Sequence, residues 1–435
     1  MRILLTGQTS LHWGRMEFGN IGNYYIIEPF IRELHRVFDN AEIVTTLQMS
    51  DDFCQKEKVK VLPMEMYYGW IEEDLPTALK EYSIADIYNK TNILIDRTPY
   101  IDEVIKSDLV IDFSGDIWGD NADFLGENRL LVGLLKNRVA QLLRKPTAML
   151  AGSPGPFNNK KLLPFVKEVY ENFDLITNRD PISTELLKQN GFKSDNVQTL
   201  PCPSFLFEPL KGKAKETLLK KEKLTNKEKP IAGFIICGWN FKKGPFDKWP
   251  RKDEEYEVFA EAVEYMINEL DLKVCLMSHS NGFPIPPAEF ELLHGRDYPV
   301  IKQFQKILYE RGNVSKENVF ALDGVYNTWE TKAILGSFDM LVSGRVHAAV
   351  GALSQNVPTV IIDYGHEPKA HKLRGFAKIA GVEEYVANPT SSKDLIQKIK
   401  KCWKNKEDIN KHLINQNFFI KKEAQKNFDL LKTIL

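Results

Sequence analysis

The sequence predicts an α/β protein of two domains, each a parallel sheet covered by helices, with a helical tail at the C-terminus. Short apolar runs alternate with longer amphipathic stretches, which is the pattern of strands and helices around a parallel sheet. This series occurs twice along the chain. The 435 residues correspond to two or three domains of ordinary size, so each series can form a domain with its own core.

The first series occupies the N-terminal half. The opening apolar run, Ile3–Leu5, is too short for the apolar core of a signal peptide and is predicted to be the first strand. Later apolar runs predict strands at Ile43–Thr45, Leu109–Phe113, Ala148–Ala151 and Leu175–Thr177. Amphipathic stretches predict helices at Tyr25–Phe38, Phe124–Leu143, Leu162–Glu171 and Ile182–Gln189.

The second series repeats this plan without repeating the sequence. Its strands are predicted at Ile231–Cys237, Val274–Met277, Val319–Leu322, Met340–Val342 and Thr359–Ile362. Its helices are predicted at Glu254–Glu269, Ile301–Arg311, Trp329–Leu335, His347–Ser354 and Leu373–Ile379. Both halves are therefore predicted to be Rossmann-like domains.

Changes in composition predict the domain boundaries. Residues 211–229 hold eight Lys and three Glu and end just before an apolar run. They predict a linker between domains 1–210 and 230–392; a solvated amphipathic helix within one domain is the alternative. Residues 393–435 hold eleven Lys and five acids, and their apolar residues predict a packed helical tail. Its basic face is either a solvated surface or a peripheral contact with anionic lipid.

Charge and cysteine usage exclude several classes of protein. Lys and Arg total 58 and Asp and Glu total 59, so the chain has no basic excess for binding nucleic acid. Five cysteines at wide, irregular spacing form neither a disulfide framework nor a zinc motif, which favours the reducing cytoplasm. No run approaches the roughly 18 apolar residues of a membrane-spanning helix. The composition itself does not separate an enzyme from a binding protein.

Two facing domains of this kind place a cleft at the carboxyl ends of their sheets, where open α/β sheets bind ligands. The loop after strand 340–342 is the most suggestive, because Ser343, Gly344 and Arg345 lead into a helix that carries His347. Gly344 permits a tight turn, and Arg345 with the helix N-terminus suits a carboxylate or phosphate. His347 can deliver a proton to the bound anion. The alternative is that Arg345 pairs with an acid and His347 belongs to the core.

Two further residues of the second half follow strands. Lys369 comes after the strand ending at Ile362 and is expected beside the Arg345 loop, where it can reach the same anion. His279 comes directly after the strand ending at Met277. An exposed Lys at a helix start and a packed His are the alternatives.

The first half offers its own strand ends. Gly115 and Asp116 follow the strand that ends at Phe113, with Asp120 close behind. Arg179 precedes a helix start at which Asp180 is expected to be the N-cap. A glycine- and asparagine-rich loop that includes Asn20 joins the first strand to the first helix. The dinucleotide fingerprint, phosphate-binding loop, nucleophile elbow and zinc-protease motifs are all missing from the sequence.

In this order, the motifs resemble those of the polysaccharide pyruvyl transferase family. The resemblance spans about residues 3–380, most of the chain. Where the family often shows three glycines, this chain has Ser114-Gly115-Asp116, so ligand contacts at that turn differ. The matching motifs are Gly19-Asn20-Ile21-Gly22-Asn23, Ser114-Gly115-Asp116, Gly155-Pro156-Phe157, Arg179-Asp180-Pro181-Ile182-Ser183, Arg345-Val346-His347-Ala348, and the loop from Tyr364 to Lys369.

The resemblance implies a fold like that of glycosyltransferase-B enzymes and the transfer of a pyruvyl group from phosphoenolpyruvate to a sugar, which forms a cyclic ketal. It implies catalytic roles for His347, Arg345 and Asp116, with Asp120 and Asp323 as alternative bases. Arg179, Lys369, Gly344, Ser343, His279, Gly115 and Asn20 are expected to bind substrate. The second domain is expected to hold the donor and the first the acceptor. No metal or cofactor is expected.

The expected partners are phosphoenolpyruvate and a sugar acceptor, a lipid-linked oligosaccharide being one form of it, and no nucleic acid. The expected location is the cytoplasm, at the inner face of the membrane where the acceptor is lipid-linked. The oligomeric state stays open. Two other functions are compatible with the residues. One is a nucleotide-sugar-dependent glycosyltransferase of the same fold, and the other is a non-catalytic protein that binds sugars or anions.

Overall fold

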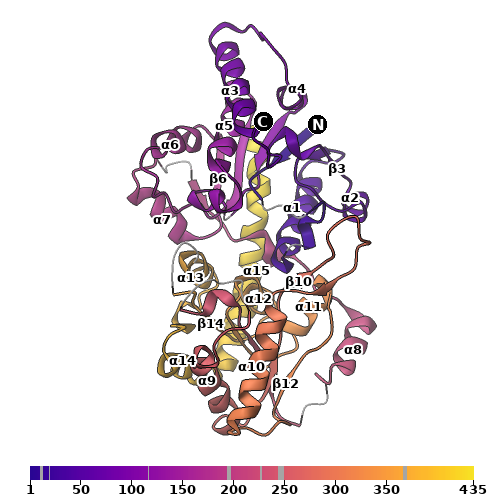
Figure 1. Ribbon diagram of the computed structural model, residues 1–435, viewed down its shortest axis with the longest axis vertical. Coiled ribbons are helices and arrows are strands. Elements are labelled where there is room, and N and C mark those ends of the chain that lie inside the picture. The colour runs from indigo at the N-terminus through magenta and orange to yellow at the C-terminus, as the bar shows by residue number, and fades with distance from the viewer. Residues whose placement is uncertain are drawn as a thin grey trace. The chain divides into compact units, whose positions relative to one another are not determined.

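A computed structural model describes residues 1–9, 13–18, 20–115, 117–193, 197–225, 228–242, 249–365 and 370–435 (Figure 1). The chain forms two compact units. Unit 1 comprises Met1–Glu17, Ile27–Pro203 and Lys422–Leu435, and unit 2 comprises Phe18–Ile26 and Ser204–Lys421. Helices α1 (Ile21–Val37) and α15 (Lys406–Asp429) therefore contribute residues to both units.

Unit 1 is built on a seven-stranded sheet in the order β3-β2-β1-β4-β5-β6-β7. Every neighbouring pair is parallel. Parallel strands need crossover connections, and helices supply them. The strands are β1 (Arg2–Thr6), β2 (Glu42–Thr45), β3 (Val59–Val61), β4 (Leu109–Asp112), β5 (Thr147–Gly152), β6 (Leu175–Asn178) and β7 (Val197–Thr199).

The helices of unit 1 bury the apolar side chains of this sheet. Leu4, Val44 and Val110 lie in a core with residues of α3, α4 and α5. Met149 and Ile176 lie in a core with residues of α5, α6 and α7. The helices besides α1 are α2 (Asp51–Glu57), α3 (Asp74–Thr91), α4 (Pro99–Lys106), α5 (Arg129–Leu142), α6 (Leu163–Glu171) and α7 (Pro181–Gln189).

Unit 2 contains a six-stranded parallel sheet in the order β12-β9-β8-β13-β14-β15. A separate antiparallel pair joins β10 (Asn281–Gly282) and β11 (Leu293–His294). The six strands are β8 (Ile231–Ile235), β9 (Lys273–Leu276), β12 (Val319–Ala321), β13 (Met340–Ser343), β14 (Thr359–Ile362) and β15 (Val386–Ala387).

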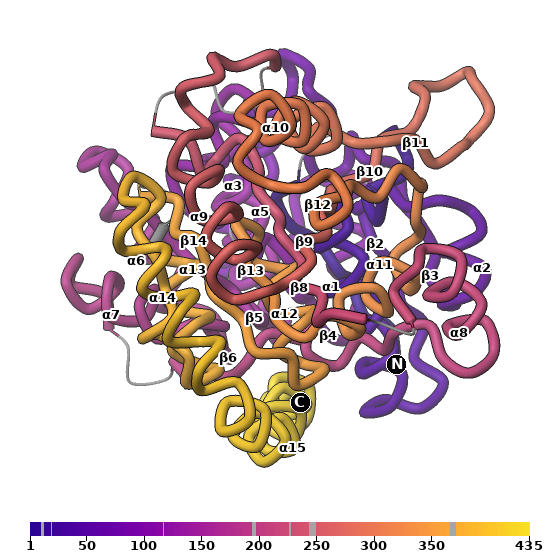
Figure 2. Tube along the Cα trace, turned by 90° about the horizontal axis from the view of Figure 1, so that it is seen from below, coloured from indigo at the N-terminus to yellow at the C-terminus, as the bar shows by residue number. Residues whose placement is uncertain are grey.

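The alternation of side chains along each strand divides the core of unit 2 in two. Ala232 and Phe234 of β8 belong to a core with α9, α10, α13 and α14. Ile231 and Ile235 belong to one with α8, α11 and α12. Figure 2 shows α14 and α15 in yellow. The helices are α8 (Gly212–Lys221), α9 (Glu257–Asn268), α10 (Asp297–Arg311), α11 (Thr328–Leu335), α12 (Val346–Leu353), α13 (Ala370–Ile379) and α14 (Ser392–Lys404).

The predicted α/β class with two Rossmann-like sheets and a helical C-terminus is confirmed. The stretch 211–229 that was expected to be a linker contains α8. The prediction of one helix over Phe124–Leu143 was wrong at its start. Residues Asp120–Leu125 form a 3-10 turn, and Asn128 has a φ of 53°, which interrupts the helix before Arg129. Among the described residues, no helix is long and apolar enough to cross a membrane.

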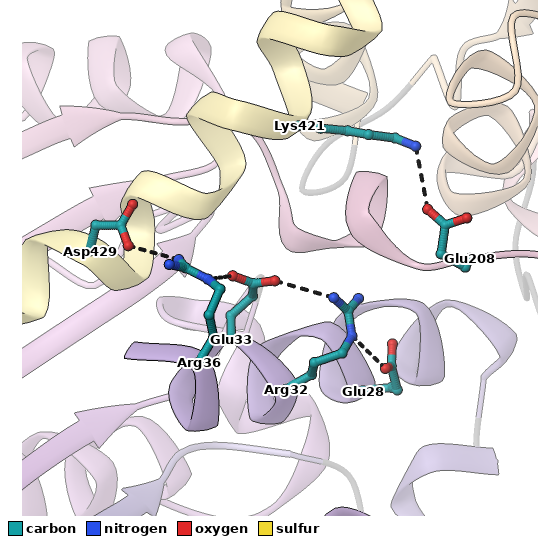
Figure 3. A network of polar contacts seen from close by, with 7 residues as sticks. All are labelled: Glu28, Arg32, Glu33, Arg36, Glu208, Lys421 and Asp429. Carbon is teal, nitrogen blue, oxygen red and sulfur yellow. Dashed lines mark hydrogen bonds and ion pairs between the residues drawn. The ribbon is translucent and has the colours of Figure 1, made fainter. Parts of the chain in front are cut away.

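The last residues of helix α15 belong to unit 1 and pack there through both apolar and polar contacts. Phe428 meets the ring of Phe30 on α1 with centroids 5.0 Å apart. Arg36 of α1 bonds Glu33 and, at 2.7 Å, Asp429 of α15 (Figure 3). The exposed end of this network contributes little, because water screens it. Figure 3 also shows Lys421 and Glu208 of unit 2, whose charged atoms are 3.5 Å apart.

Asn427 is the buried polar anchor of the same helix. Its amide oxygen accepts the Thr177 hydroxyl at 2.5 Å, and its amide nitrogen donates to the Pro201 carbonyl at 3.0 Å. The Thr177 hydroxyl also accepts the N–H of Ala151, a residue with a φ of 51° at the end of β5. A fully buried asparagine with these bonds connects α15 to β6 and to the segment after β7, and through Thr177 to the end of β5.

We expect Asn427→Ala to lower the free energy of unfolding by about 2–4 kcal/mol, because it leaves the buried Thr177 hydroxyl without an acceptor and the buried Pro201 carbonyl without its donor. Urea unfolding followed by circular dichroism measures the change. Asn415→Ala is the matched control, since that side chain is exposed on the same helix. Equal losses in the two variants would show that helix propensity, and not the buried bonds, accounts for the effect.

Candidate functional site

Four neighbouring strands of unit 2 bring the polar residues of their loops to one edge of the sheet. The strands β9, β8, β13 and β14 are adjacent and parallel, so their carboxyl ends lie side by side. His279 follows β9 and Cys237 follows β8. Arg345 follows β13, and Tyr364 follows β14. The structure thus brings the Arg345 loop and His279 to the same edge of the sheet.

Gly344 permits a close approach between two of these loops. Its N–H donates to the Ile235 carbonyl at 2.7 Å. A Cβ atom on Gly344 would lie 2.0 Å from the amide oxygen of the buried Asn240. That oxygen accepts the Cys237 N–H at 2.9 Å, and the Asn240 amide nitrogen donates to the Ile362 carbonyl at 3.3 Å. Asn240 therefore links three strand ends, and only a glycine fits beside it.

Ser343 and Arg345 shape the start of α12. The Ser343 hydroxyl accepts the Arg345 N–H at 3.1 Å and donates to the Arg345 carbonyl at 3.0 Å. Arg345 occupies the N-cap position with extended backbone angles, so the helix begins at Val346. The unbonded N–H groups of a helix start favour anions. Ser343 thereby holds the backbone of Arg345 in the conformation that starts this helix.

The guanidinium of Arg345 forms a buried bidentate ion pair with Asp297. Its Nε lies 2.9 Å from one carboxylate oxygen, and an Nη bonds the other. Burial by itself lowers the pKa of Arg345, but the adjacent Asp297 carboxylate outweighs this effect and the pKa is raised. The pair has no net charge, and two of the five N–H groups of the guanidinium are used by Asp297. An anion bound here would therefore be held by directed N–H groups more than by net charge.

His279 is a buried imidazole with a strongly shifted pKa. It is 1% exposed, and its Nε2 has no hydrogen-bond partner among the described residues. Burial lowers its pKa well below the usual 6.5, and the charges of Arg345 and His347 lower it further. Its ring meets the edge of Tyr25, 5.8 Å away between centroids. A neutral imidazole at this position can exchange a hydrogen bond or a proton with a ligand.

His347 lies in the first turn of α12 and contacts the beginning of α1. A Cβ atom on Gly22 would lie 2.2 Å from the His347 Nδ1. Asn20 caps this end of α1, since its side-chain oxygen accepts the Gly22 N–H at 3.0 Å. The structure thus brings Asn20 and His347 together within unit 2, although 327 positions separate them in the sequence.

The strand ends of unit 1 form a second polar cluster around Asp180. The Asp180 carboxylate accepts the N–H of Ser183 at 2.7 Å and the hydroxyls of Ser183 and Ser153 at 2.8 Å each. The Ser153 hydroxyl in turn accepts the Arg179 Nε at 2.9 Å. Asp180 is therefore the N-cap of α7, as the sequence analysis expects, and it also orients Arg179 through a serine.

Gly115 completes this cluster. It has a φ of 60°, and its carbonyl accepts the Ser153 N–H at 2.9 Å. A Cβ atom on Gly115 would lie 3.7 Å from an Nη of Arg179. The buried Asp112 fixes the turn by accepting the Ser114 N–H and the Asn137 amide, both at 2.6 Å. The loops that carry Gly115, Ser153 and Arg179 therefore meet within unit 1.

Two predicted residues are not described by the structure, and two alternative residues bond other partners. Asp116 and Lys369 lie outside the described residues. Asp120 accepts the backbone N–H groups of residues 158 and 159. Asp323 accepts the Tyr298 hydroxyl at 2.9 Å and the Lys302 ammonium at 3.0 Å. Within the part of the chain that the structure describes, no group of three or more His, Cys, Asp or Glu side chains could hold a metal ion.

Sequence analysis missed two residues that organise the site, Asp297 and Asn240. Asp297 precedes Arg345 by 48 positions and is the first residue of α10. An acid at a helix start is an ordinary dipole partner, so the sequence offers no sign of its pairing. Asn240 lies in a short 3-10 turn after β8. The signal available for it was its position just after a strand of the second half.

The stability of the protein should depend on His279 below pH 6.5. Its pKa in the folded chain lies well below 6.5, so in this range the unfolded chain binds a proton that the folded chain does not. Acidification then favours unfolding. We expect His279→Gln to reduce the slope of unfolding free energy against pH by up to about 1.4 kcal/mol per pH unit between pH 4.5 and 6.5. Urea unfolding at several pH values measures it.

His412→Gln is the matched control, because that side chain is exposed. An unchanged slope in His279→Gln, or the same change in both variants, would contradict a buried neutral His279.

Gly22→Ala should displace His347. Inside a helix Ala is ordinarily favoured over Gly by about 1 kcal/mol, but the added methyl group would overlap the His347 ring. We therefore expect Gly22→Ala to destabilise the wild-type chain, and to destabilise a chain that carries His347→Ala much less, because only the Cβ of residue 347, 3.0 Å away, then remains in contact. Thermal unfolding of the four proteins of this cycle measures the coupling. Independent, additive effects of the two substitutions would show that the contact does not constrain His347.

Comparison with known proteins places these clusters in context. The family model for polysaccharide pyruvyl transferase matches residues 20–366. The amylovoran biosynthesis protein AmsJ of Erwinia amylovora is 22% identical over 427 residues, 94% of each chain. Among solved structures, a glycosyltransferase from Rickettsia africae has a TM-score of 0.58 and 13% identity and covers 99% of this chain and 98% of its own.

HepE from Anabaena, solved in complex with UDP, has a TM-score of 0.56 and 14% identity over 100% of this chain and 97% of its own. These two structures share the fold, which confirms the expected likeness to glycosyltransferase-B enzymes. Because the family model covers most of the sequence, including the loops of both clusters, the chain belongs to the polysaccharide pyruvyl transferase family.

Proposed function

We propose that this protein transfers a pyruvyl group from phosphoenolpyruvate to a sugar of a polysaccharide or its precursor, forming a cyclic ketal and releasing phosphate. Membership of the family supports pyruvyl transfer, and the relative in Erwinia amylovora is an amylovoran biosynthesis protein. The observation that carries the proposal is the start of α12. There the oriented guanidinium of Arg345, the helix N-terminus and the His347 imidazole follow one strand.

In this proposal the donor binds at the strand ends of unit 2. Phosphoenolpyruvate carries a carboxylate and a phosphate, both of which accept hydrogen bonds from a guanidinium and from helix N–H groups. Asp297 fixes the plane of Arg345, so its remaining N–H groups have a set direction. Ser343 and Gly344 shape the turn, His279 supplies a neutral imidazole, and Lys369 is proposed as a further cation.

The chemistry is proposed as addition followed by substitution at one carbon. His347 donates a proton to the methylene carbon of phosphoenolpyruvate, which leaves an oxocarbenium-like centre at the neighbouring carbon. One sugar hydroxyl adds to that carbon, and the carbon–oxygen bond to phosphate breaks. The second hydroxyl then closes the ketal. Of the two hydroxyl protons, one replaces the proton of His347 and the other leaves with phosphate. Hydrogen-bond donors of the protein at the phosphate stabilise the negative charge that develops there.

A carboxylate is proposed to accept a hydroxyl proton, and Asp116 is the residue we assign. Asp120 and Asp323 are less suited to this role. Asp120 is already bonded to backbone N–H groups. Burial raises the pKa of Asp323, but Lys302 and Tyr298 outweigh this effect and the pKa is lowered, which weakens it as a base. Since the enol phosphate is already activated, the reaction as written uses no cofactor.

Arg179, Gly115 and Asn20 are proposed to bind substrate as well. Arg179 and Gly115 belong to unit 1, to which we assign the acceptor. We propose the cytoplasm as the site of reaction, at the inner face of the membrane where the acceptor is lipid-linked.

Phosphate release tests the proposed function. Purified protein is incubated with phosphoenolpyruvate and galactosyl, mannosyl and glucosyl acceptors, and the product is examined by mass spectrometry for the added pyruvyl ketal. We expect release that depends on both substrates. Thermal stabilisation by UDP or GDP but not by phosphoenolpyruvate, without phosphate release, would instead identify a nucleotide-sugar glycosyltransferase. Binding of phosphoenolpyruvate without release on any acceptor would favour a non-catalytic binding protein.

His347→Ala should lower kcat by about 100-fold or more while phosphoenolpyruvate still stabilises the protein against heat, because the variant loses a proton donor and keeps Arg345. Steady-state phosphate release and thermal shift measure the two effects. His412→Ala, at an exposed position, is the control. Loss of donor binding with unchanged kcat at saturation would contradict the acid role of His347.

A further inference from the structure

A narrow pocket in unit 1 lies at the carboxyl ends of β1, β2 and β3. Its walls include Thr9 after β1, Thr46 after β2 and Tyr67 after β3. Arg129, the first residue of α5, forms another wall. The cavity volume is about 20 Å³, which admits one water-sized group and not a whole sugar ring. Open α/β sheets bind ligands at the carboxyl ends of their strands. The pocket follows β1, β2 and β3, whereas Arg179 follows β6.

Arg129 presents buried donors to this pocket. The side chain is 2% exposed, and one Nη donates to the Thr9 carbonyl. Its Nε and Nη1 have no hydrogen-bond partner among the described residues. The Tyr67 and Thr46 hydroxyls are likewise buried and unbonded within the described part of the chain. Three polar side chains around one small cavity therefore have groups that could donate hydrogen bonds to a ligand.

Aromatic rings fix the guanidinium of Arg129 in place. Its central carbon lies 4.3 Å from the ring centroid of Tyr68 and 4.6 Å from that of Trp70. Both rings are themselves held by hydrogen bonds of 2.7 Å to backbone carbonyls, the Tyr68 hydroxyl to Glu127 and the Trp70 N–H to Leu125. The direction in which Arg129 presents its N–H groups is thus set before a ligand arrives.

Two other buried cations have an acid as a direct partner, whereas Arg129 has none among the described residues. Lys136 bonds Glu81 at 2.5 Å, and Arg345 bonds Asp297. The carboxylate that acts electrostatically on Arg129 is that of Asp74, and it already accepts the N–H groups of Gly69 and Ile71. A buried guanidinium stays charged, and a charge buried without a counterion is costly. An anionic ligand would remove this cost.

We propose that the Arg129 pocket binds a carboxylate or phosphate group of the sugar acceptor. Arg129 supplies two N–H donors to the anion, and the Tyr67 and Thr46 hydroxyls bond its remaining oxygens or an adjacent sugar hydroxyl. The small cavity takes an oxygen of the anionic group, and the rest of the ligand stays outside it. The identification of this ligand as the acceptor rests on the proposed function, whereas the anion site itself does not.

Anion binding to the full-length protein tests this proposal. Galacturonate, galactose 1-phosphate and neutral galactose are compared by thermal shift and calorimetry on wild type, Arg129→Met and Arg138→Met. Arg138 lies on the same helix, paired at the surface with Glu168. We expect at least one anionic sugar to bind wild type and Arg138→Met, at least about tenfold more weakly to Arg129→Met, and galactose to bind none of them detectably. The preferred anion tells a carboxylate from a phosphate acceptor.

The stability of the variant separates a binding role from a structural one. Since Arg129→Met removes a buried charge without a counterion, its unliganded Tm should equal or exceed that of wild type. A large loss of Tm, with Arg129→Lys failing to restore anion binding, would show that Arg129 only supports the fold. Equal affinity of wild type and Arg129→Met for the anionic sugars would also overturn the proposal.

Phosphoenolpyruvate is included as a competing ligand. If Arg129→Met loses stabilisation by phosphoenolpyruvate and not by the anionic sugars, the pocket takes the donor and the proposal is wrong. If anionic sugars bind through Arg129 but no phosphate is released with any acceptor, the proposed function fails and the anion site stands. If phosphate is released but Arg129→Met binds the anionic sugars as tightly as wild type does, the proposed function stands and the anion site fails.

Discussion

The buried ion pair between Arg345 and Asp297 is the constraint on which the site of unit 2 depends. It connects the N-cap of α12 to the first turn of α10, two elements that follow different strands. Asp297 holds the guanidinium on one side of the turn at Gly344. Asn240 fills the space beside Gly344, so the turn has little conformational freedom. The same pair sets the electrostatics of the site, since the positive charge of Arg345 helps to keep His279 neutral.

Unit 1 uses an acid for the same purpose in a different way. Asp180 orients Arg179 through the hydroxyl of Ser153. In both clusters a buried carboxylate fixes a guanidinium at a strand end, which removes rotamers before a ligand binds.

The parts of the fold that were predictable from sequence are those whose signal is local. The runs at residues 340–342 and 360–362 are apolar throughout because both faces of a parallel sheet are covered, and Asp180 before Pro181 is recognisable as an N-cap. Edge strands such as β3 and β7 have three residues each and carry no such run. Helix α3 lacks a clear apolar stripe, so it was not predicted.

The candidate site divides along the same line. Arg345, His347 and Gly344 were identifiable because they share one turn after one strand. The pairing of Arg345 with Asp297, the contact of His347 with Gly22 and the unbonded N–H groups of Arg129 each depend on segments that meet only in the folded chain. Charge state was the least predictable property, because a sequence shows which side chains are cationic and not which of them have a counterion.

That distinction bears on how one enzyme could handle two anionic substrates. Phosphoenolpyruvate carries a carboxylate and a phosphate, so it would repel an acceptor sugar that is also anionic. Each substrate therefore needs hydrogen-bonding groups of its own on the protein. The chain supplies them in separate units. Arg345 is neutralised by Asp297 and can recognise an anion by the direction of its N–H groups, whereas Arg129 keeps an uncompensated charge. Under the proposed function, a neutral acceptor would leave that charge buried at a cost, whereas an anionic acceptor would remove the cost.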